Sequence, residues 1–282
     1  MRGAARPIAV FDSGVGGLTV YRTLRRRLPR ESLVYFGDTA HVPYGTKSPE
    51  TVRTLTRTHL AFLARRGVKC AVVACNTASA VALDPPDRAG AGGRPSRIPL
   101  IGVIEPGVRM ALARTRNGRI GVLGTSTTIA SGAYQRRLAD AGVSKVTARA
   151  CPLFVPLIEE GWARHPLATR IAAEYVAPLK RAGVDTVILG CTHYPLLRPV
   201  LARVFGRGVT LVDSAEAVEL EVERVLADRG WLRAAGRGRD IFYLTDTGGK
   251  FPAVARRFLG RPIGRLVKVD MRVEAVNDAV RA

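Results

Sequence analysis

Two cysteines occupy matching positions in two similar segments of the chain. Residues 67–77 read G-V-K-C-A-V-V-A-C-N-T, and residues 183–193 read G-V-D-T-V-I-L-G-C-T-H. When Cys75 is aligned with Cys191, the glycine and valine that open each segment also match. A thiol has an ordinary pKa of about 8.5, which a helix N-terminus or a cationic histidine lowers. We therefore interpret the two thiols as candidate acid–base groups, one in each half of the chain.

Other roles for the cysteines stay open at this point. Either one alone could be a buried structural thiol, as is expected for Cys70 in the same apolar run as Cys75. The four cysteines could form two disulfides, but reduced thiols are the better expectation without a secretion signal. A C-x-x-C pair is absent, so no structural zinc site is predicted, although Cys191-Thr192-His193 leaves a metal site as an alternative.

The segments around both cysteines predict a strand that ends at the thiol. A glycine that can end a preceding helix opens each segment. The short apolar, β-branched run that follows is typical of a parallel strand buried on both faces. Because ligands of open α/β sheets bind at the carboxyl ends of strands, each thiol should stand at an active edge.

The rest of the chain predicts alternating strands and helices, hence an α/β fold. Residues 8–13 resemble residues 120–125, although any two strands of such a fold share this composition. The expected division is a first domain of residues 1–99 and 216–282 on the Cys75 side, and a second of residues 100–215 on the Cys191 side. We expect one helix from the threonines near residue 125 to about Ala141, and a flexible loop over residues 84–97.

A glycine-rich turn follows the first predicted strand, in the sequence D-S-G-V-G-G of residues 12–17. It does not fit a dinucleotide fingerprint, because the third glycine would fall at Thr19. The carboxylate of Asp12 would also repel a pyrophosphate. Asp12 and Ser13 beside a glycine turn suit a small zwitterion better.

The net charge of +21, from 44 basic and 23 acidic side chains, raises the question of nucleic-acid binding. The arginines are spread over most helix-like segments, without interleaved aromatic residues or a recognised motif. We therefore expect solvated arginine-rich faces, with weak, salt-sensitive affinity for polyanions and no specific nucleic-acid partner. A nucleic-acid-binding protein on an enzyme-like fold remains the alternative from another class.

No membrane or export signal is evident in the sequence. No apolar run approaches the ~20 residues that span a bilayer. The amino-terminal sequence M-R-G-A-A-R-P-I-A-V-F-D lacks the apolar region of a signal peptide. We therefore expect a cytoplasmic protein that does not associate with membranes.

Taken together, seven motifs in order resemble the glutamate racemases of the aspartate/glutamate racemase superfamily. They are F-D-S-G-V-G-G-L, Y-F-G-D-T-A-H-V-P-Y-G, A-C-N-T-A-S-A, I-G-V-I-E-P-G, C-P-L-F-V-P-L-I-E-E-G, G-C-T-H-Y-P-L-L and L-V-D-S-A-E-A-V. The resemblance implies two pseudo-symmetric, parallel-sheet α/β domains with the active site in the cleft between them. It also implies cofactor-independent interconversion of L- and D-glutamate for peptidoglycan synthesis, and a homodimer.

The resemblance also implies roles for individual residues. Cys75 and Cys191 would be the two acid–base thiols, Asp12 would assist the first, and Glu159 and His193 the second. The residues expected to hold the amino acid are Asp12, Ser13, Tyr44, Gly45, Asn76, Thr77, Thr192 and His193, with Thr125 and Thr128 as weaker candidates. No metal is implied. Inverting an α-carbon needs a base on one face and an acid on the other, and a thiol in each half has that symmetry.

Two departures from the family pattern stand out. Thr127 takes the place of a small residue before the second threonine, which affects the shape of that loop. The Pro- and Gly-rich residues 84–97 replace a more regular helical stretch. Within the enzyme class, racemisation of aspartate or another amino-acid-like substrate is the alternative.

Overall fold

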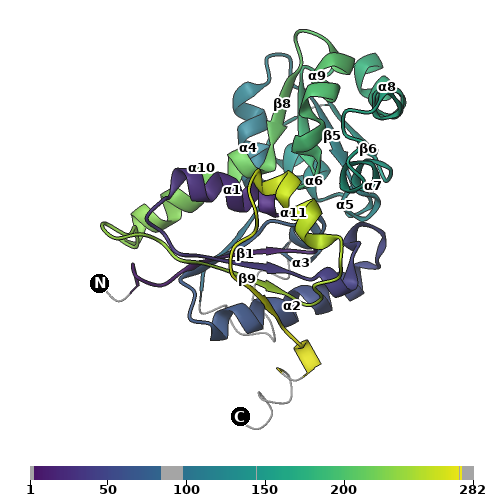
Figure 1. Ribbon diagram of the computed structural model, residues 1–282. Helices are drawn as coiled ribbons and strands as arrows, with labels where there is room; N and C mark the ends of the chain where they lie inside the picture. The colour runs from purple at the N-terminus through teal and green to yellow at the C-terminus, as the bar shows by residue number, and fades with distance from the viewer. Residues whose placement is uncertain (1–2, 84–97, 144, 273, 275–282) are drawn as a thin grey trace.

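Two lobes, each built on its own parallel sheet, make up the computed structural model (Figure 1). The structure describes residues 3–83, 98–143, 145–272 and 274, so the loop expected over residues 84–97 lies outside the described residues. The fold class predicted from the sequence, two parallel-sheet α/β domains, is confirmed.

The first sheet has six strands in the order β10-β9-β2-β1-β3-β4. Its strands are β1 (Ile8–Asp12), β2 (Leu33–Gly37), β3 (Cys70–Val73), β4 (Leu100–Gly102), β9 (Asp240–Leu244) and β10 (Leu266–Lys268). All the pairings are parallel. Strands from both ends of the chain therefore share this sheet, with β9 paired to β2.

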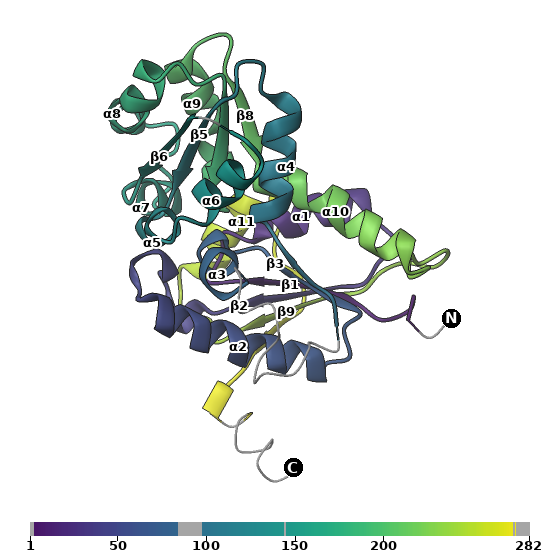
Figure 2. The same cartoon turned by 180° about the vertical axis from the view of Figure 1, so that it is seen from behind.

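Helices cover both faces of the first sheet. The views in Figures 1 and 2 show α1, α10 and α11 on the face toward the second lobe and α2 on the other. The bounds are α1 (Leu18–Arg27), α2 (Pro49–Arg65), α3 (Asn76–Ala82), α10 (Ser214–Asp228) and α11 (Phe251–Leu259), with short 3-10 turns η1 (Thr39–His41) and η2 (Tyr44–Thr46). The Ser48 hydroxyl caps α2 by accepting from Thr51 N at 3.2 Å, and proline holds the first helical position.

The second sheet has four parallel strands in the order β6-β5-β7-β8. They are β5 (Arg119–Gly124), β6 (Lys145–Ala150), β7 (Thr186–Gly190) and β8 (Thr210–Asp213). The helices of this lobe are α4 (Ile104–Arg114), α5 (Ser126–Ala130), α6 (Ala133–Asp140), α7 (Phe154–Glu159), α8 (Pro166–Arg181) and α9 (Arg198–Phe205), with the 3-10 turn η5 (Tyr194–Leu197).

One helix of this lobe differs from the prediction. The single helix expected to run to about Ala141 is divided into α5 and α6 by Gly132, whose φ of 68° lies in the left-handed region. α5 is therefore a separate short helix at the edge of the sheet.

The chain crosses between the sheets twice. β4 pairs with β3 in the first sheet, so the first crossing follows Gly102, slightly later than the predicted boundary before residue 100. The second crossing follows Asp213, where β8 leads into α10. α10 packs on both α1 and α4, and Figure 2 shows α4 and α10 meeting between the lobes.

The strands are buried on both faces, which explains their continuous apolar sequences. In β1, Ile8 and Val10 face one core cluster, whereas Ala9 and Phe11 face the other. Among the described residues, no helix combines the length and the apolar character that a bilayer crossing requires.

Candidate active site

Cys75 and Cys191 line the same cavity, a cleft of about 330 Å³ between the two lobes. The first lobe contributes the ends of its strands and the segment around η2, and the second contributes α5, α7 and the end of β7. The lining residues are Ser13, Gly14, Val42, Pro43, Tyr44, Gly45, Thr46, Cys75, Asn76, Thr77, Thr125, Ser126, Pro152, Val155, Pro156, Glu159, Cys191, Thr192 and His193.

Cys75 is the N-cap of α3 and lies two residues after the end of β3. Its sulfur accepts a hydrogen bond from Ala78 N at 3.5 Å, and its thiol donates to Ser13 Oγ at 3.6 Å. Burial, and next the negative charge of Asp12, raise the pKa of the Cys75 thiol to about 12, although the Ala78 N–H acts in the opposite direction. The sequence led us to expect a lowered pKa at the helix start, and for Cys75 this expectation is wrong because burial outweighs the hydrogen bond.

Asp12 lies behind the cleft wall and is fully buried. Its carboxylate accepts from Gly14 N at 3.0 Å and from the Thr192 hydroxyl at 3.4 Å, so it joins the two lobes. Burial raises the pKa of Asp12, and the nearby charge of His193 opposes this effect. The charge of Asp12 thus acts on Cys75 in its own lobe and on His193 in the second lobe.

Cys191 has a histidine and a carboxylate beside it. His193 Nδ1 lies 3.9 Å from the Cys191 sulfur, and its Nε2 lies 2.8 Å from Glu159 Oε1. Burial acts to lower the pKa of His193, but the interactions with Cys191 and Glu159 prevail and raise it to about 10. The imidazole is therefore cationic at neutral pH and would stabilise negative charge on the Cys191 sulfur.

The glycine-rich turn of the first lobe touches this second group directly. A Cβ atom at Gly16 would lie 2.2 Å from Thr192 Oγ1 and 2.4 Å from His193 Nδ1. The hydroxyl of Thr19 also donates to Thr192 O at 3.0 Å. In a dinucleotide-binding protein, a glycine at the position of Gly16 would let the backbone approach a phosphate. Here Gly16 instead allows the two lobes to meet.

Asn76 presents an unused donor to the cleft. Its side-chain oxygen accepts from the Tyr134 hydroxyl at 2.7 Å and from the Ser214 hydroxyl at 3.2 Å, which orients the amide. Its Nδ2 atom is buried and has no partner among the described residues. A buried amide N–H without a partner is unfavourable, so this donor suits a bound carboxylate.

Three threonine hydroxyls join the two lobes where α3 meets α5. Thr77 Oγ1 lies 2.9 Å from Thr125 Oγ1 and 3.1 Å from Thr128 Oγ1. Thr125 also caps α5, and it borders the cleft, whereas Thr128 is fully buried behind it. The structure therefore brings both weaker candidates to the site.

Asp38 is a buried neighbour of the site that the sequence analysis did not single out. Its carboxylate accepts from the Tyr44 hydroxyl at 2.6 Å and from the Thr245 hydroxyl at 2.8 Å. His59 Nε2 lies 2.9 Å and His41 Nδ1 2.8 Å from the same carboxylate. Burial acts to raise the pKa of Asp38, but these contacts lower it overall, so the group is ionised.

The Asp38 cluster holds Tyr44 in place. Ligand atoms of Asp38, His41 and His59 lie within 4.8 Å of one another, a spacing that a metal ion could use. His41, Tyr44 and Thr245 hydrogen bond to the Asp38 carboxylate, and His59 lies at ion-pair distance from it. The signal in the sequence was Y-F-G-D-T, in which the acid ends the strand next to that of Asp12.

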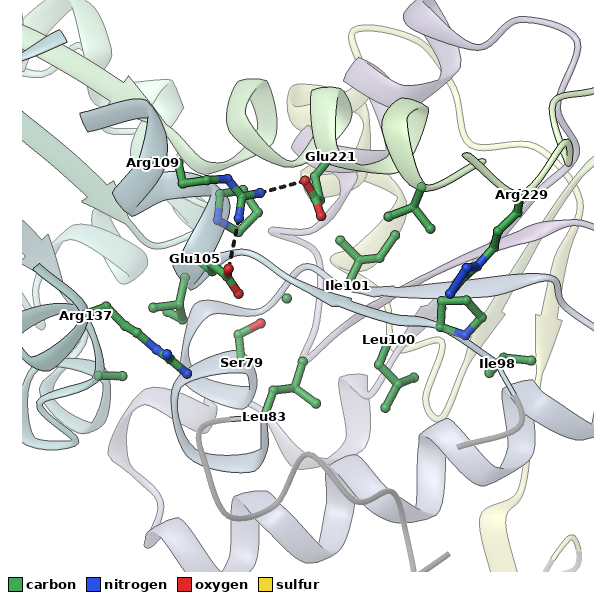
Figure 3. Close-up of a pocket in the computed structure, with 16 residues that line it drawn as sticks. Ser79, Leu83, Ile98, Leu100, Ile101, Glu105, Arg109, Arg137, Glu221 and Arg229 are labelled. Carbon is green, nitrogen blue, oxygen red and sulfur yellow. Dashed lines mark hydrogen bonds and ion pairs between the residues drawn. The ribbon is translucent and has the colours of Figure 1, made fainter. Parts of the chain in front are cut away.

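A second, larger cavity of about 480 Å³ lies between α4, α10 and β4. Three of its charged side chains pair with each other, because Arg109 donates to Glu105 at 3.0 Å and to Glu221 at 2.6 Å, as Figure 3 shows. Neither of the paired thiols borders it. We therefore assign the acid–base chemistry to the smaller cleft.

All the predicted site residues line the cleft except Asp12 and the weaker candidate Thr128, which are buried behind it. Glu159 is the last residue of α7. The lining residues that the sequence analysis missed are largely apolar or backbone contributors: Gly14, Val42, Pro43, Thr46, Ser126, Pro152, Val155 and Pro156.

Comparisons with known proteins agree with this geometry. Residues 8–219 match the family model described as Asp/Glu/Hydantoin racemase. The chain is 47% identical to a glutamate racemase of Geobacter metallireducens, over 95% of this chain and 98% of that protein. The crystal structure of a Bacillus anthracis glutamate racemase isoform matches with a TM-score of 0.88 and 38% identity, over 95% of this chain and 98% of that one. A Francisella tularensis glutamate racemase in complex with D-glutamate matches with a TM-score of 0.88 and 34% identity, over 96% and 99% of the two chains.

Proposed function

Because the chain belongs to the Asp/Glu/Hydantoin racemase family, we propose that it interconverts L-glutamate and D-glutamate without a cofactor. The product D-glutamate would serve peptidoglycan synthesis. The observation that carries the proposal is the presence of Cys75 and Cys191, from separate sheets, on one cleft.

The reaction needs one proton removed and another delivered. One thiolate takes the α-proton of the bound amino acid, and the opposite thiol donates its own proton to the other face of the α-carbon. The configuration is inverted, and the thiol and thiolate have exchanged places. For the reverse reaction, the two groups exchange roles.

Each thiol has its own charged neighbours. Asp12 interacts with Cys75, whereas the cationic His193, held by Glu159, lies beside Cys191. The α-proton is weakly acidic, so the developing carbanion depends on hydrogen-bond donors that are already in place. The unpartnered Nδ2 of Asn76 supports such a role at a substrate carboxylate. The other proposed binding groups are Ser13, Tyr44, Gly45, Thr77 and Thr192.

The decisive experiment is loss of optical rotation from L-glutamate with no added cofactor. L-aspartate and a substituted hydantoin, tested in parallel, distinguish the alternative substrates within the family. Retained rotation of L-glutamate with activity on one of the others would overturn the proposed substrate but not the chemistry.

Isotope labelling tests the two-base assignment separately. In deuterated water at low conversion, D-glutamate should carry deuterium at the α-carbon, while the remaining L-glutamate stays protiated. A single base that swings between faces would return the abstracted proton, so early protiated D-glutamate would exclude two opposed thiols.

We further propose that the protein is cytoplasmic and, on family resemblance alone, that it forms a homodimer. Sedimentation at several protein concentrations tests the dimer, and fractionation of the source cells tests the location. For the high positive charge, we propose only weak, non-specific polyanion binding.

A further inference from the structure

We propose that Thr127 is a positioning residue, whose hydroxyl latches residues 43–47 of the first lobe over the cleft. The inference rests on the proposed function, because it concerns how the same site closes on its substrate. It assigns a role to a side chain that stands where the family resemblance expects a small residue.

The latch consists of two hydrogen bonds from one side chain. Thr127 Oγ1 lies 3.0 Å from Gly45 O and 3.0 Å from Lys47 O, and it can share its proton between these two carbonyl oxygens. Thr127 is on α5 of the second lobe, whereas both acceptors belong to the first lobe, in and just after η2. The contact therefore bridges the lobes.

The latched segment forms part of the cleft wall. Pro43, Tyr44, Gly45 and Thr46 all line the cavity, as do the neighbours of Thr127 on the other side, Thr125 and Ser126. Thr127 itself is not among the lining residues. It therefore acts on the substrate through the position of the segment.

The backbone at Gly45 and the start of α5 lie so close together that the hydrogen bonds of Thr127 can form only when the cleft is closed at this point. A Cβ atom at Gly45 would lie 2.7 Å from Thr125 Cβ, so only glycine permits this approach. The hydroxyls of Thr125 and Thr128 join α5 to Thr77 on α3, whereas Thr127 joins α5 to the segment itself. Any movement of residues 43–47 away from α5 would break the two hydrogen bonds of Thr127.

The latch should stabilise the closed cleft and leave the proton transfers unchanged. Its loss should therefore weaken substrate binding more than turnover, because saturating substrate itself drives closure. A hydrogen bond of ordinary strength corresponds to about a 3- to 10-fold change in affinity.

The test compares Thr127→Val, which keeps the shape and removes the hydroxyl, with Thr127→Ser, which keeps the hydroxyl. Thr58→Val is the matched control, because Thr58 is exposed on α2 and donates only within its helix, to Thr54 O. We expect Thr127→Val to raise KM for both enantiomers by about 3- to 10-fold, with kcat within about twofold. Thr127→Ser and Thr58→Val should keep the KM of the original protein.

A second readout does not require activity. Without substrate, iodoacetamide should alkylate Cys75 and Cys191 faster in Thr127→Val than in Thr127→Ser. Cys70 and Cys151 are fully buried away from the cleft, so their alkylation rates should not change. Mass spectrometry of the four peptides follows each thiol separately.

Several results would overturn the latch. An unchanged KM in Thr127→Val, an equal defect in Thr127→Ser, or faster alkylation of all four thiols would each do so, the last by indicating general loosening. If the original protein does not racemise glutamate, the proposed substrate fails, whereas the alkylation rates still test the latch.

Discussion

The pairing of the buried His193 with Glu159 should make the stability of the protein depend on pH in a way that one substitution removes. The interactions with Cys191 and Glu159 overcome burial and raise the pKa of His193 from 6.5 to about 10. A group whose pKa is raised by folding stabilises the protein fully below its unfolded pKa, and that contribution disappears as the pH rises through its folded pKa. The contribution of His193 should therefore be present at pH 6 and lost by about pH 10.

The size of the effect follows from the contacts. A rise from 6.5 to about 10 sets an upper limit of about 5 kcal/mol. Part of it requires Cys191 to be ionised, and the Glu159 side chain is 40% exposed, so solvent screens the pair. A hydrogen bond between charged groups contributes about 1.5–3 kcal/mol, and we expect about 2 kcal/mol.

The assay is urea unfolding of the original protein and of His193→Asn, each at pH 6 and at pH 10. Asparagine does not titrate, so the original protein should lose about 2 kcal/mol more than the variant between these pH values. His165→Asn is the control, because His165 is exposed and caps α8 through a nitrogen that asparagine can replace with its oxygen. Equal losses in the original protein and His193→Asn would refute the reasoning.

Three further predictions concern the thiols, the Asp38 cluster and the surface charge. Cys75→Ala and Cys191→Ala should each lower kcat by far more than tenfold without changing the circular dichroism spectrum. A variant that keeps more than a tenth of the original kcat, a loss below about 1.4 kcal/mol in the activation free energy, would exclude that thiol as an obligatory acid–base group. Asp38→Asn should loosen Tyr44 and raise KM more than it lowers kcat, with a stability loss of about 1.5–3 kcal/mol in urea unfolding; unchanged KM would contradict a positioning role. Binding of any DNA should be independent of its sequence and fall steeply between low and physiological salt in a filter-binding assay, so tight, sequence-specific binding at physiological salt would contradict it.

The parts of the fold that the sequence predicted are those governed by local pattern. Gly67 and Gly183 end helices, and the apolar runs after them form buried strands that end just before Cys75 and Cys191. These features depend on nearest neighbours along the chain. The position of Gly132 is also local, but its role as a break appears only from its left-handed conformation.

The features that escaped prediction depend on residues far apart in sequence. The state of Asp38 is set by His59 and Thr245, and the raised pKa of the Cys75 thiol is set by burial and by Asp12. The hydrogen bonds of Thr127 likewise need the second lobe to close on residues 43–47. Such contacts exist only in the folded protein, where distant segments of the chain meet, so composition and periodicity carry no signal for them.

The order of the strands has a consequence for biosynthesis. Every strand of the second sheet lies between residues 119 and 213, whereas the first sheet includes β9 and β10 near the carboxyl end. During translation the second sheet can be completed while β2 still lacks its partner β9 and presents an unpaired edge. The first sheet therefore stays incomplete, with the edge of β2 exposed, until the last part of the chain leaves the ribosome. Slow synthesis of residues 214–268 would lengthen the interval in which this chain is most prone to aggregate.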